Sequence, residues 1–264
     1  MSDLGGGFGL PQMNKRDMFE QLLSEDTNRS SIEPEIASAI GEQMLHMDLR
    51  QLPRSVRVRI RDITGRIPTK NTIIVGGGIG HLTAWLLDLW CGDPANDSED
   101  IRHKPNTLRV IEEGGKFGII IDRLIRRYSA NNWAEVIVGS WSEVFAETQS
   151  WNAAAAALPD SARMSPLPQP IDLIIVDLSD DERVEASISA FDLLSVGGIL
   201  ITLEPEVPTG DVGDPKDGQE RTPAQRKVES FNRWISFIQN VDAHHSAAFL
   251  ELTGGTLAVF RRSA

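Results

Sequence analysis

TIIVGGGIGHLT, residues 72–83, is the stretch that decides the fold of this chain. An apolar run over residues 73–75 ends in glycines at 76, 77, 78 and 80, and an apolar helical pattern follows over residues 81–90. Glycines at a strand-to-helix turn let the backbone approach a ligand without a Cβ clash, and the N-terminus of the helix adds the positive end of a dipole. The stretch predicts a nucleotide-type binding turn, although such turns also occur for packing alone.

The spacing of these glycines separates two kinds of nucleotide turn. The dinucleotide fingerprint GxGxxG requires glycine at position 81, where this chain has His81. Glycines at 76, 78 and 80 give the spacing GxGxG instead. The turn therefore departs from the dinucleotide fingerprint, and the rest of the chain must identify the ligand.

Net charge and cysteine content limit the kinds of ligand and partner that the chain can bind. The 264 residues have a formal net charge of −12 and a single cysteine, Cys91. The negative charge opposes nonspecific attraction to nucleic acid or anionic lipid, and one cysteine excludes an intrachain disulfide framework or a multi-cysteine zinc site. Because we find neither a signal-peptide pattern nor an apolar run of membrane-spanning length, we expect a cytoplasmic protein with no nucleic-acid or membrane partner.

The chain divides into three segments. Residues 1–15 are rich in glycine and lack periodicity, so we expect a disordered tail. Residues 16–70 predict helices, at 18–23 and 33–47, that pack on the core of the remaining domain. Residues 71–264 predict the ligand-binding domain, which includes a long loop over 205–223 of the kind that often forms a binding element or lid.

A cluster of arginines lies near the end of the helical segment 16–70. Its arginines are Arg54, Arg57, Arg59, Arg61 and Arg66. The pattern fits either a strand or a helix that begins after Pro53. We interpret the cluster as the solvated face of an element packed on the core, with contact to an acidic substrate or RNA as the alternative.

Strands alternate with helices from residue 72 onward. The expected strands are 72–75, 108–111, 134–138, 171–176 and 198–203, followed by a helix over 224–238 and two further strands, 247–252 and 257–260. Nearly continuous apolar strands suit a parallel sheet covered on both faces. The last two strands surround Gly254-Gly255, which predicts a hairpin. The expected fold class is therefore α/β, with a doubly wound, mainly parallel seven-stranded sheet that ends in an antiparallel hairpin.

Candidate ligand-binding residues follow the strands, because ligands of open α/β sheets bind outside the carboxyl ends of the strands. Glu112 and Glu113 follow the second strand, and an acidic side chain there can accept hydrogen bonds from both hydroxyls of a ribose. Gly139, Ser140 and Trp141 follow the third strand, where a Trp or Ser can contact an adenine ring. Glu112 has the stronger claim of the two carboxylates, and each position also fits a purely structural role.

Asp177 ends the fourth strand and is the strongest candidate for a chemical role. A carboxylate at this place can orient the cationic end of a cofactor, bind a metal or act as a base. Glu204 ends the fifth strand and points toward the same cleft if both strands are parallel. We interpret the acidic run 180–182 as a solvated helix start, and His244 and His245 as side chains that diverge too far to share a metal.

Six motifs occur in the order that class I S-adenosylmethionine-dependent methyltransferases show: VGGGIG, VIEE, VGSW, IDLIIVD, LLSVGGILIT and GGTLAVFRR. The part from Ile171 onward most resembles the catechol and caffeoyl-CoA O-methyltransferases. This resemblance covers about 200 residues and implies a Rossmann-like methyltransferase fold, S-adenosylmethionine as cofactor and a small-molecule acceptor oxygen. It places the glycine turn, Glu112, Glu113, residues 139–141 and Asp177 at the cofactor, and it is compatible with a homodimer.

Departures from that family concern its chemistry. The family has an acidic residue where this chain has Ile74, an Asp-Asn pair where it has Glu204-Pro205, and a lysine near Ser179. We therefore assign no metal site and leave a divalent metal open, with Asp177 and Glu204 as its only plausible ligands. Two alternatives stay open: a methyltransferase-fold binding protein without catalysis, and a polyamine aminopropyltransferase-like enzyme, whose Asp beside the glycines is Ile79 here.

Overall fold

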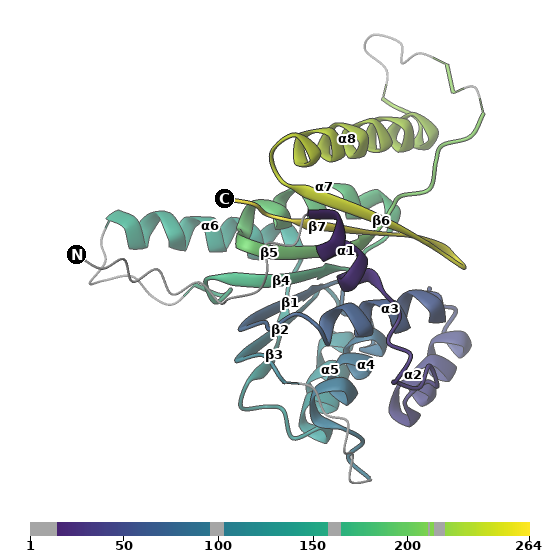
Figure 1. Ribbon diagram of the computed structural model, residues 1–264, viewed down its shortest axis with the longest axis vertical. Coiled ribbons are helices and arrows are strands. Elements are labelled where there is room, and N and C mark those ends of the chain that lie inside the picture. Colours follow the sequence, from purple (N-terminus) through teal and green to yellow (C-terminus); the bar gives the residue numbers. More distant parts are fainter. Residues whose placement is uncertain (1–14, 96–102, 158–164, 211, 214–219) are drawn as a thin grey trace.

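The computed structural model describes residues 15–95, 103–157, 165–210, 212–213 and 220–264. Its centre is a seven-stranded sheet with the strand order β3-β2-β1-β4-β5-β7-β6 (Figure 1). The strands are β1 (Asn71–Val75), β2 (Thr107–Glu112), β3 (Ala134–Val138), β4 (Ile171–Val176), β5 (Leu194–Leu203), β6 (Ser246–Leu252) and β7 (Gly255–Arg261). The predicted fold class is confirmed.

The first five strands are parallel, and the last two form an antiparallel hairpin. All five residues of β1 are buried, and β1 pairs in parallel with β2 on one side and β4 on the other. β7 lies antiparallel between β5 and β6, as the Gly254-Gly255 turn predicts. The carboxyl ends of the parallel strands β1 to β5 consequently meet at one edge of the sheet, where the candidate site residues lie.

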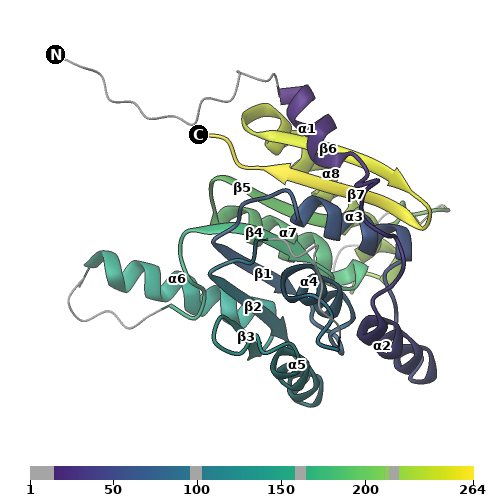
Figure 2. The same ribbon diagram turned by 60° about the horizontal axis from the view of Figure 1, so that its bottom comes forward.

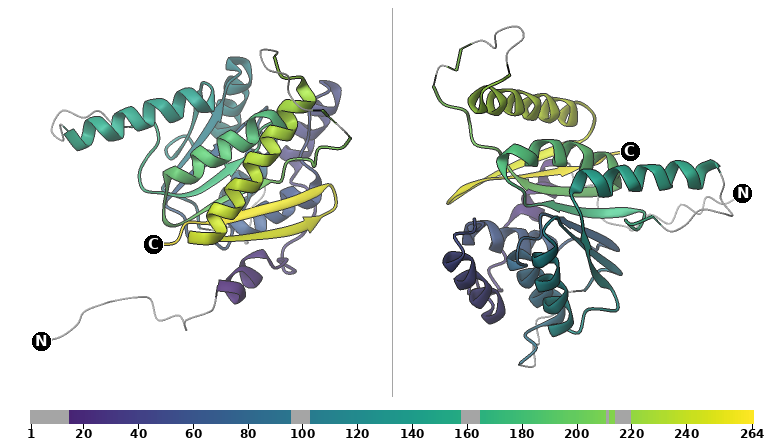
Figure 3. Two further views of the ribbon diagram at one scale, coloured as in Figure 1. Left: turned by 90° about the horizontal axis from the view of Figure 1, so that it is seen from above. Right: turned by 180° about the vertical axis from the view of Figure 1, so that it is seen from behind.

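Helices cover both faces of the sheet. They are α1 (Lys15–Leu23), α2 (Glu35–His46), α3 (Arg54–Thr64), α4 (His81–Cys91), α5 (Gly115–Arg127), α6 (Trp141–Ala157), α7 (Asp180–Leu193) and α8 (Pro223–His244). Side chains of α6, α7 and α8 pack against one face of the sheet and form one hydrophobic core. Side chains of α2 to α5 pack against the opposite face and form a second core. Figures 2 and 3 show the two layers, with α2 lying outside α4.

The segment 54–64 forms a helix, which settles the strand-or-helix alternative. Its buried apolar stripe is Val56, Ile60 and Ile63. The interpretation of the basic cluster as a solvated face is wrong for Arg57 and Arg61, whose exposed fractions are 5% and 3%. Both guanidinium groups lie over the ring of Trp85, at 5.6 and 5.5 Å from its centroid, so cation–π contact and burial hold them inside the molecule.

The other arginines of the cluster bind backbone carbonyls of the N-terminal segment. Arg54 donates to Ser31 O, Arg59 to Leu23 O, and Arg66 to Leu22 O and Ser24 O. These contacts link residues 22–31 to α3 and to the turn that follows it. The arginine cluster therefore holds residues 22–31 against the segment 54–66.

Two predictions from the sequence concern residues that lie partly or mostly outside the described ranges. The predicted disordered tail, residues 1–15, falls outside the described residues except for Lys15, where α1 begins. Part of the long loop over 205–223 is likewise outside the described ranges. Across the described residues, no helix combines the length and apolar character needed to cross a bilayer.

Candidate functional site

The glycine turn joins β1 to α4 in a backbone conformation that side chains disfavour. Gly76, Gly78 and Gly80 have φ values of +88°, +53° and +90°. A Cβ at Gly76 would lie 2.2 Å from the backbone oxygen of Asp177, whereas a Cβ at Gly78 would meet nothing within 4 Å. Gly76 is therefore required for packing against the end of β4, and Gly78 faces open space.

That open space is a cavity of about 820 Å³ at the carboxyl edge of the sheet. Nine of the ten predicted cofactor-binding residues line it: Gly76, Gly77, Gly78, Glu112, Glu113, Gly139, Ser140, Trp141 and Asp177. The tenth, Gly80, belongs to the turn but does not line the cavity. A Cβ there would lie 2.9 Å from Leu124 of α5, so Gly80 serves helix packing.

Glu112, at the end of β2, is bonded to the glycine turn. Its carboxylate accepts hydrogen bonds from Gly78 N–H at 2.6 Å and from Gly114 N–H at 2.8 Å. Burial raises the pKa of Glu112, and the two backbone donors oppose that rise. The side chain is only 9% exposed, whereas Glu113 is exposed at the edge of the cavity. Glu112 thus holds the turn in place and presents a buried acceptor to the cavity.

Ser140 and Trp141 form the wall beyond β3. Trp141 is 8% exposed, and its indole Nε1 donates to Ser189 Oγ at 2.8 Å. Ser140 donates from its backbone N–H and its hydroxyl to Glu143 Oε2, at 3.0 and 2.9 Å, and so starts α6. These two bonds lower the pKa of Glu143. The wall combines a fixed aromatic ring with nearby polar groups, as a nucleobase site needs.

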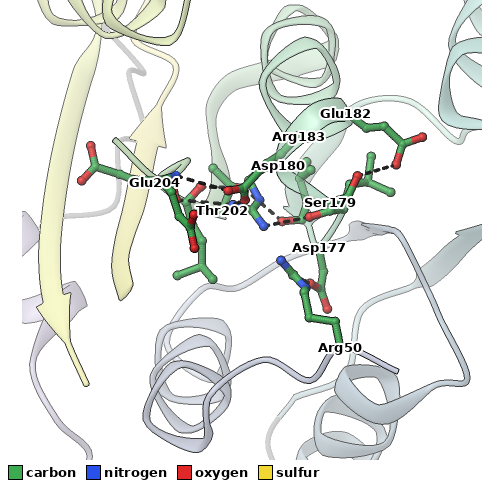
Figure 4. A network of polar contacts seen from close by, with 12 residues as sticks. Arg50, Asp177, Ser179, Asp180, Glu182, Arg183, Thr202 and Glu204 are labelled. Carbon is green, nitrogen blue, oxygen red and sulfur yellow. Dashed lines mark hydrogen bonds and ion pairs between the residues drawn. The ribbon is translucent and has the colours of Figure 1, made fainter. Parts of the chain in front are cut away.

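Asp177 is paired with a residue that the sequence did not single out. Arg50, in the connection between α2 and α3, donates from Nη2 to Asp177 Oδ1 at 2.8 Å across 127 positions of sequence (Figure 4). Burial raises the pKa of Asp177, and the positive charges of Arg50 and Arg183 oppose the rise. No sequence signal marks Arg50, because its position depends on how the N-terminal helices pack.

Asp177 and Glu204, the only plausible metal ligands in the sequence, do not form a site that fits a divalent cation. The buried guanidinium of Arg183 donates to Asp180 Oδ1 at 2.5 Å, to Leu178 O at 2.8 Å and to Glu204 O at 3.4 Å. Glu204 Oε1 accepts from Trp234 Nε1 at 3.4 Å. The described residues contain no group of three or more His, Cys, Asp or Glu side chains arranged to hold a metal. A fixed positive charge lies between the ends of β4 and β5, and we derive no step through a metal ion.

His81 anchors a second cluster, of which His81 and Arg57 line the cavity. Its Nε2 lies 2.7 Å from Glu33 Oε1, and Arg57 Nη1 lies 2.8 Å from its Nδ1. Trp85 Nε1 donates to the same Glu33 oxygen at 3.2 Å. In the sequence, the one feature that marked this cluster was His81 at the position where the dinucleotide fingerprint GxGxxG has its third glycine. The cluster links α3 and α4 to the segment that precedes α2, and so fixes one wall of the cavity.

Burial lowers the pKa of His81, although the hydrogen bond to Glu33 opposes the shift. An unfolded histidine titrates near pH 6.5, so the unfolded chain takes up this proton first as the pH falls. We expect the free energy of unfolding to be greatest above that pH and to fall by on the order of 1 kcal/mol between about pH 7.5 and about pH 5.5 through this group. Urea unfolding at both pH values measures the loss, which should shrink in His81→Gln.

The exposed His103 supplies the control for that measurement. His103→Gln, measured in the same way, shows the effect of removing a histidine that does not belong to the cluster of His81, Glu33 and Arg57. An unchanged pH dependence in His81→Gln would contradict the assignment.

No protein-family model and no curated protein sequence matches this chain. Its fold, however, matches many solved structures. The O-methyltransferase from Bacillus cereus, solved with S-adenosylhomocysteine, superposes with a TM-score of 0.54 over 93% of this chain and 97% of its own, at 16% identity. The O-methyltransferase TomG from Streptomyces achromogenes, solved with S-adenosylmethionine, gives 0.56 over 94% and 95%, also at 16% identity.

A third structure extends the match to nearly the whole chain. The methyltransferase PaMTH1 from Podospora anserina, solved with S-adenosylhomocysteine, has a TM-score of 0.55 over 98% of this chain and all of its own, at 14% identity. Identities this low establish the architecture. The chain has the Rossmann-like fold of these methyltransferases, with its cavity at the carboxyl edge of the sheet.

Proposed function

We propose that this chain is an S-adenosylmethionine-dependent methyltransferase that methylates an oxygen atom of a small molecule. The observation that carries the proposal is the buried Glu112 carboxylate, bound to the N–H of Gly78 beside a cavity of about 820 Å³. A glycine turn and an acidic side chain at neighbouring strand ends match the phosphate-free nucleoside that this cofactor contains. The likeness to methyltransferases solved with cofactor or product supports the same assignment.

In this proposal the cofactor's nucleoside lies along the ends of β1, β2 and β3. Glu112 accepts hydrogen bonds from the ribose hydroxyls, and Gly76, Gly77 and Gly78 allow close approach of the backbone. Ser140 and Trp141 contact the adenine ring. Glu113, at the exposed edge, shields the ribose from one side.

When bound, S-adenosylmethionine supplies an electrophilic methyl group on a positively charged sulfur. The chain's own contribution is to position an acceptor and to exclude water. The apolar side chains for this task come from the N-terminal segment and α4; they are Met44, Leu49, Leu52 and Leu82. The acceptor is proposed to lie against these side chains, near Asp177. A cytoplasmic location and a homodimer, both compatible with the sequence, belong to the same proposal.

Calorimetry with S-adenosylmethionine, S-adenosylhomocysteine, decarboxylated S-adenosylmethionine and NAD tests the cofactor. We expect binding of the first two; absence of binding by both at millimolar concentration would overturn the proposal. Preference for the decarboxylated compound would favour aminopropyl transfer instead.

Transfer of a labelled methyl group to a panel of phenols, other alcohols and amines tests the reaction. Labelling of hydroxyl compounds is the expected result. Cofactor binding with a uniformly negative panel would favour a binding protein of the same fold.

A further inference from the structure

Arg57 is a buried cation on the wall of the cavity. Its side chain is 6% exposed, yet the residue lines the cavity together with His81. Burial lowers the pKa of Arg57, and the negative charges of Glu33 and Asp177 oppose the fall. A guanidinium loses its proton only far above neutral pH, so Arg57 stays charged. The cavity therefore has a fixed positive charge that water reaches poorly.

One edge of this guanidinium has no acceptor in the protein. Arg57 contacts Glu33 Oε1 at 3.1 Å and the ring of His81, in each case through Nη1. Nε is buried without a hydrogen-bond partner. No described residue accepts a hydrogen bond from Nη2, which lies on the same edge as Nε. A buried donor without a partner destabilises the protein, so this edge calls for an explanation.

Two other arginines of α3 use the same edge for contacts within the protein. Nε and Nη2 of Arg54 both donate to Ser31 O, at 3.0 and 2.5 Å. Those of Arg61 both donate to Asp62 Oδ1, at 3.1 and 2.7 Å. Of the three arginines, Arg57 alone lines the cavity. A ligand in the cavity can therefore supply the acceptor that Arg57 lacks.

The wall around Arg57 is apolar. Leu49, Leu52 and Leu82 lie on it, whereas Glu33 contacts Arg57 without lining the cavity. Among the described residues, the carboxylates that line the cavity follow β2 and β4 or belong to α7; they are Glu112, Glu113, Asp177, Asp181, Glu182 and Glu185. The wall around Arg57 consequently suits a ligand that has an apolar body and one negative group.

Arg50 is the other arginine among the described residues that line the cavity. Its Nη2 donates to Asp177 Oδ1 at 2.8 Å, and its side chain is 48% exposed. Water competes with a ligand for an exposed guanidinium and screens its charge. A buried guanidinium interacts more strongly with an anion, because the surroundings have a lower dielectric constant. Arg57 is therefore the better anion-binding group of the two.

We propose that Arg57 binds a carboxylate of the methyl acceptor, so that the acceptor is a small hydroxy acid with an apolar body. The inference rests on the proposed function, whose cofactor brings a positively charged sulfur into the same cavity. The Nε–Nη2 edge of a guanidinium matches the two oxygens of a carboxylate, and hydrogen bonds between charged groups are stronger than neutral ones. The carboxylate serves for recognition, and a separate hydroxyl group of the acceptor is the one that is methylated.

Calorimetry on the full chain, saturated with S-adenosylhomocysteine, tests this contact. Saturation occupies the cofactor's part of the cavity, so an added anion cannot bind there. The ligands are the ortho, meta and para isomers of hydroxybenzoate, each compared with its uncharged amide. We expect at least one acid to bind at millimolar concentration, and to bind about 10- to 100-fold more tightly than its amide, the effect of a charged hydrogen bond.

Arg57→Met should abolish the preference for the acid, because it removes the donors and keeps an apolar side chain. Its affinity for S-adenosylhomocysteine should stay within about threefold of wild type, since the cofactor contacts are intact. Arg57→Lys keeps the charge without the edge of two donors, so it should keep only part of the preference. Thermal unfolding verifies that each variant is folded, and Arg57→Lys carries the test if Arg57→Met is not.

Arg54→Met is the matched control. Arg54 lies on the same helix, is exposed and does not line the cavity, so its replacement removes an equal charge without touching the ligand. The preference for the acid should stay within about threefold of wild type.

Several results would overturn the inference. They are that no acid binds the saturated chain, that none binds more tightly than its amide, or that the preference persists in Arg57→Met. Binding of phenyl phosphate without binding of any hydroxybenzoate would also overturn it. If Arg57→Met weakens S-adenosylhomocysteine and leaves the preference for the acid, Arg57 binds the cofactor instead.

The cofactor measurement separates these failures from a failure of the proposed function. In each of them S-adenosylhomocysteine still binds the wild-type chain, so the proposed cofactor stands. If S-adenosylhomocysteine and S-adenosylmethionine both fail to bind wild type, the proposed function and the inference fail together.

Discussion

Glu112→Gln is expected to bind S-adenosylhomocysteine about 10- to 100-fold more weakly than the wild-type chain, the loss that follows removal of charged hydrogen bonds. The substitution removes the negative charge proposed to accept the ribose hydroxyls. In the wild-type chain, one carboxylate oxygen accepts from Gly78 N–H and the other from Gly114 N–H. The substitution replaces one of these oxygens with an amide N–H₂ group, which then faces a backbone N–H as donor against donor. Calorimetry with S-adenosylhomocysteine measures the loss of affinity.

Glu113→Gln provides the comparison, because Glu113 carries the same charge at the exposed edge of the same cavity. Both variants lose one negative charge at the cavity, whereas only Glu112→Gln removes the contact with the turn. We expect Glu113→Gln to weaken binding by less than about threefold, since water screens an exposed charge. Equal losses in the two variants would contradict the role assigned to Glu112.

Gly76→Ala is expected to lower the free energy of unfolding by at least about 3 kcal/mol, because it combines a left-handed backbone with an overlap inside the core. Gly76 has a φ of +88°, and its Cβ would lie 2.2 Å from Asp177 O and 2.9 Å from Leu178 Cδ2. The backbone oxygen cannot move aside without disturbing the end of β4. Urea unfolding measures the change in stability.

Gly78→Ala and Gly210→Ala separate the causes of that loss. Both glycines have positive φ values, +53° and +91°, and a Cβ at either would meet nothing within 4 Å. Each variant should therefore show only the cost of the backbone conformation, about 1–2 kcal/mol. Gly78→Ala should also weaken binding of S-adenosylhomocysteine, since its methyl group enters the cavity. A Gly76→Ala chain as stable as Gly210→Ala would refute the packing argument.

The charged groups around Asp177 do not fit the divalent metal ion of the catechol and caffeoyl-CoA O-methyltransferases, which the sequence resembles. The sequence showed only what was missing: the lysine near Ser179 and the Asp-Asn pair at Glu204. The structure shows what is present instead, namely Arg183 between β4 and β5 and Arg50 on the cavity wall. Two guanidinium groups near one carboxylate make binding of an additional divalent cation unfavourable by like-charge repulsion.

The basic cluster shows where reasoning from the sequence failed. Arg57 and Arg61 lie on the same helix as the exposed Arg54 and the half-buried Arg59, and the sequence pattern alone assigns them all to one solvated face. Their burial depends on Trp85, Glu33 and Ser30, which come from other parts of the chain. A charge enters a protein interior only where such partners exist, and partners that are distant in sequence leave no periodic signal.

The sequence by itself determined the α/β class, the mainly parallel sheet, the closing hairpin and the glycine turn, and it pointed to Glu112, Trp141 and Asp177. These features follow from apolar periodicity, strand ends and glycine spacing, which are local properties of the chain. Only the tertiary structure decided that Arg50 faces Asp177 and that Glu33 supports His81. Those contacts join residues 127 and 48 positions apart, and they depend on how the N-terminal helices pack against the sheet.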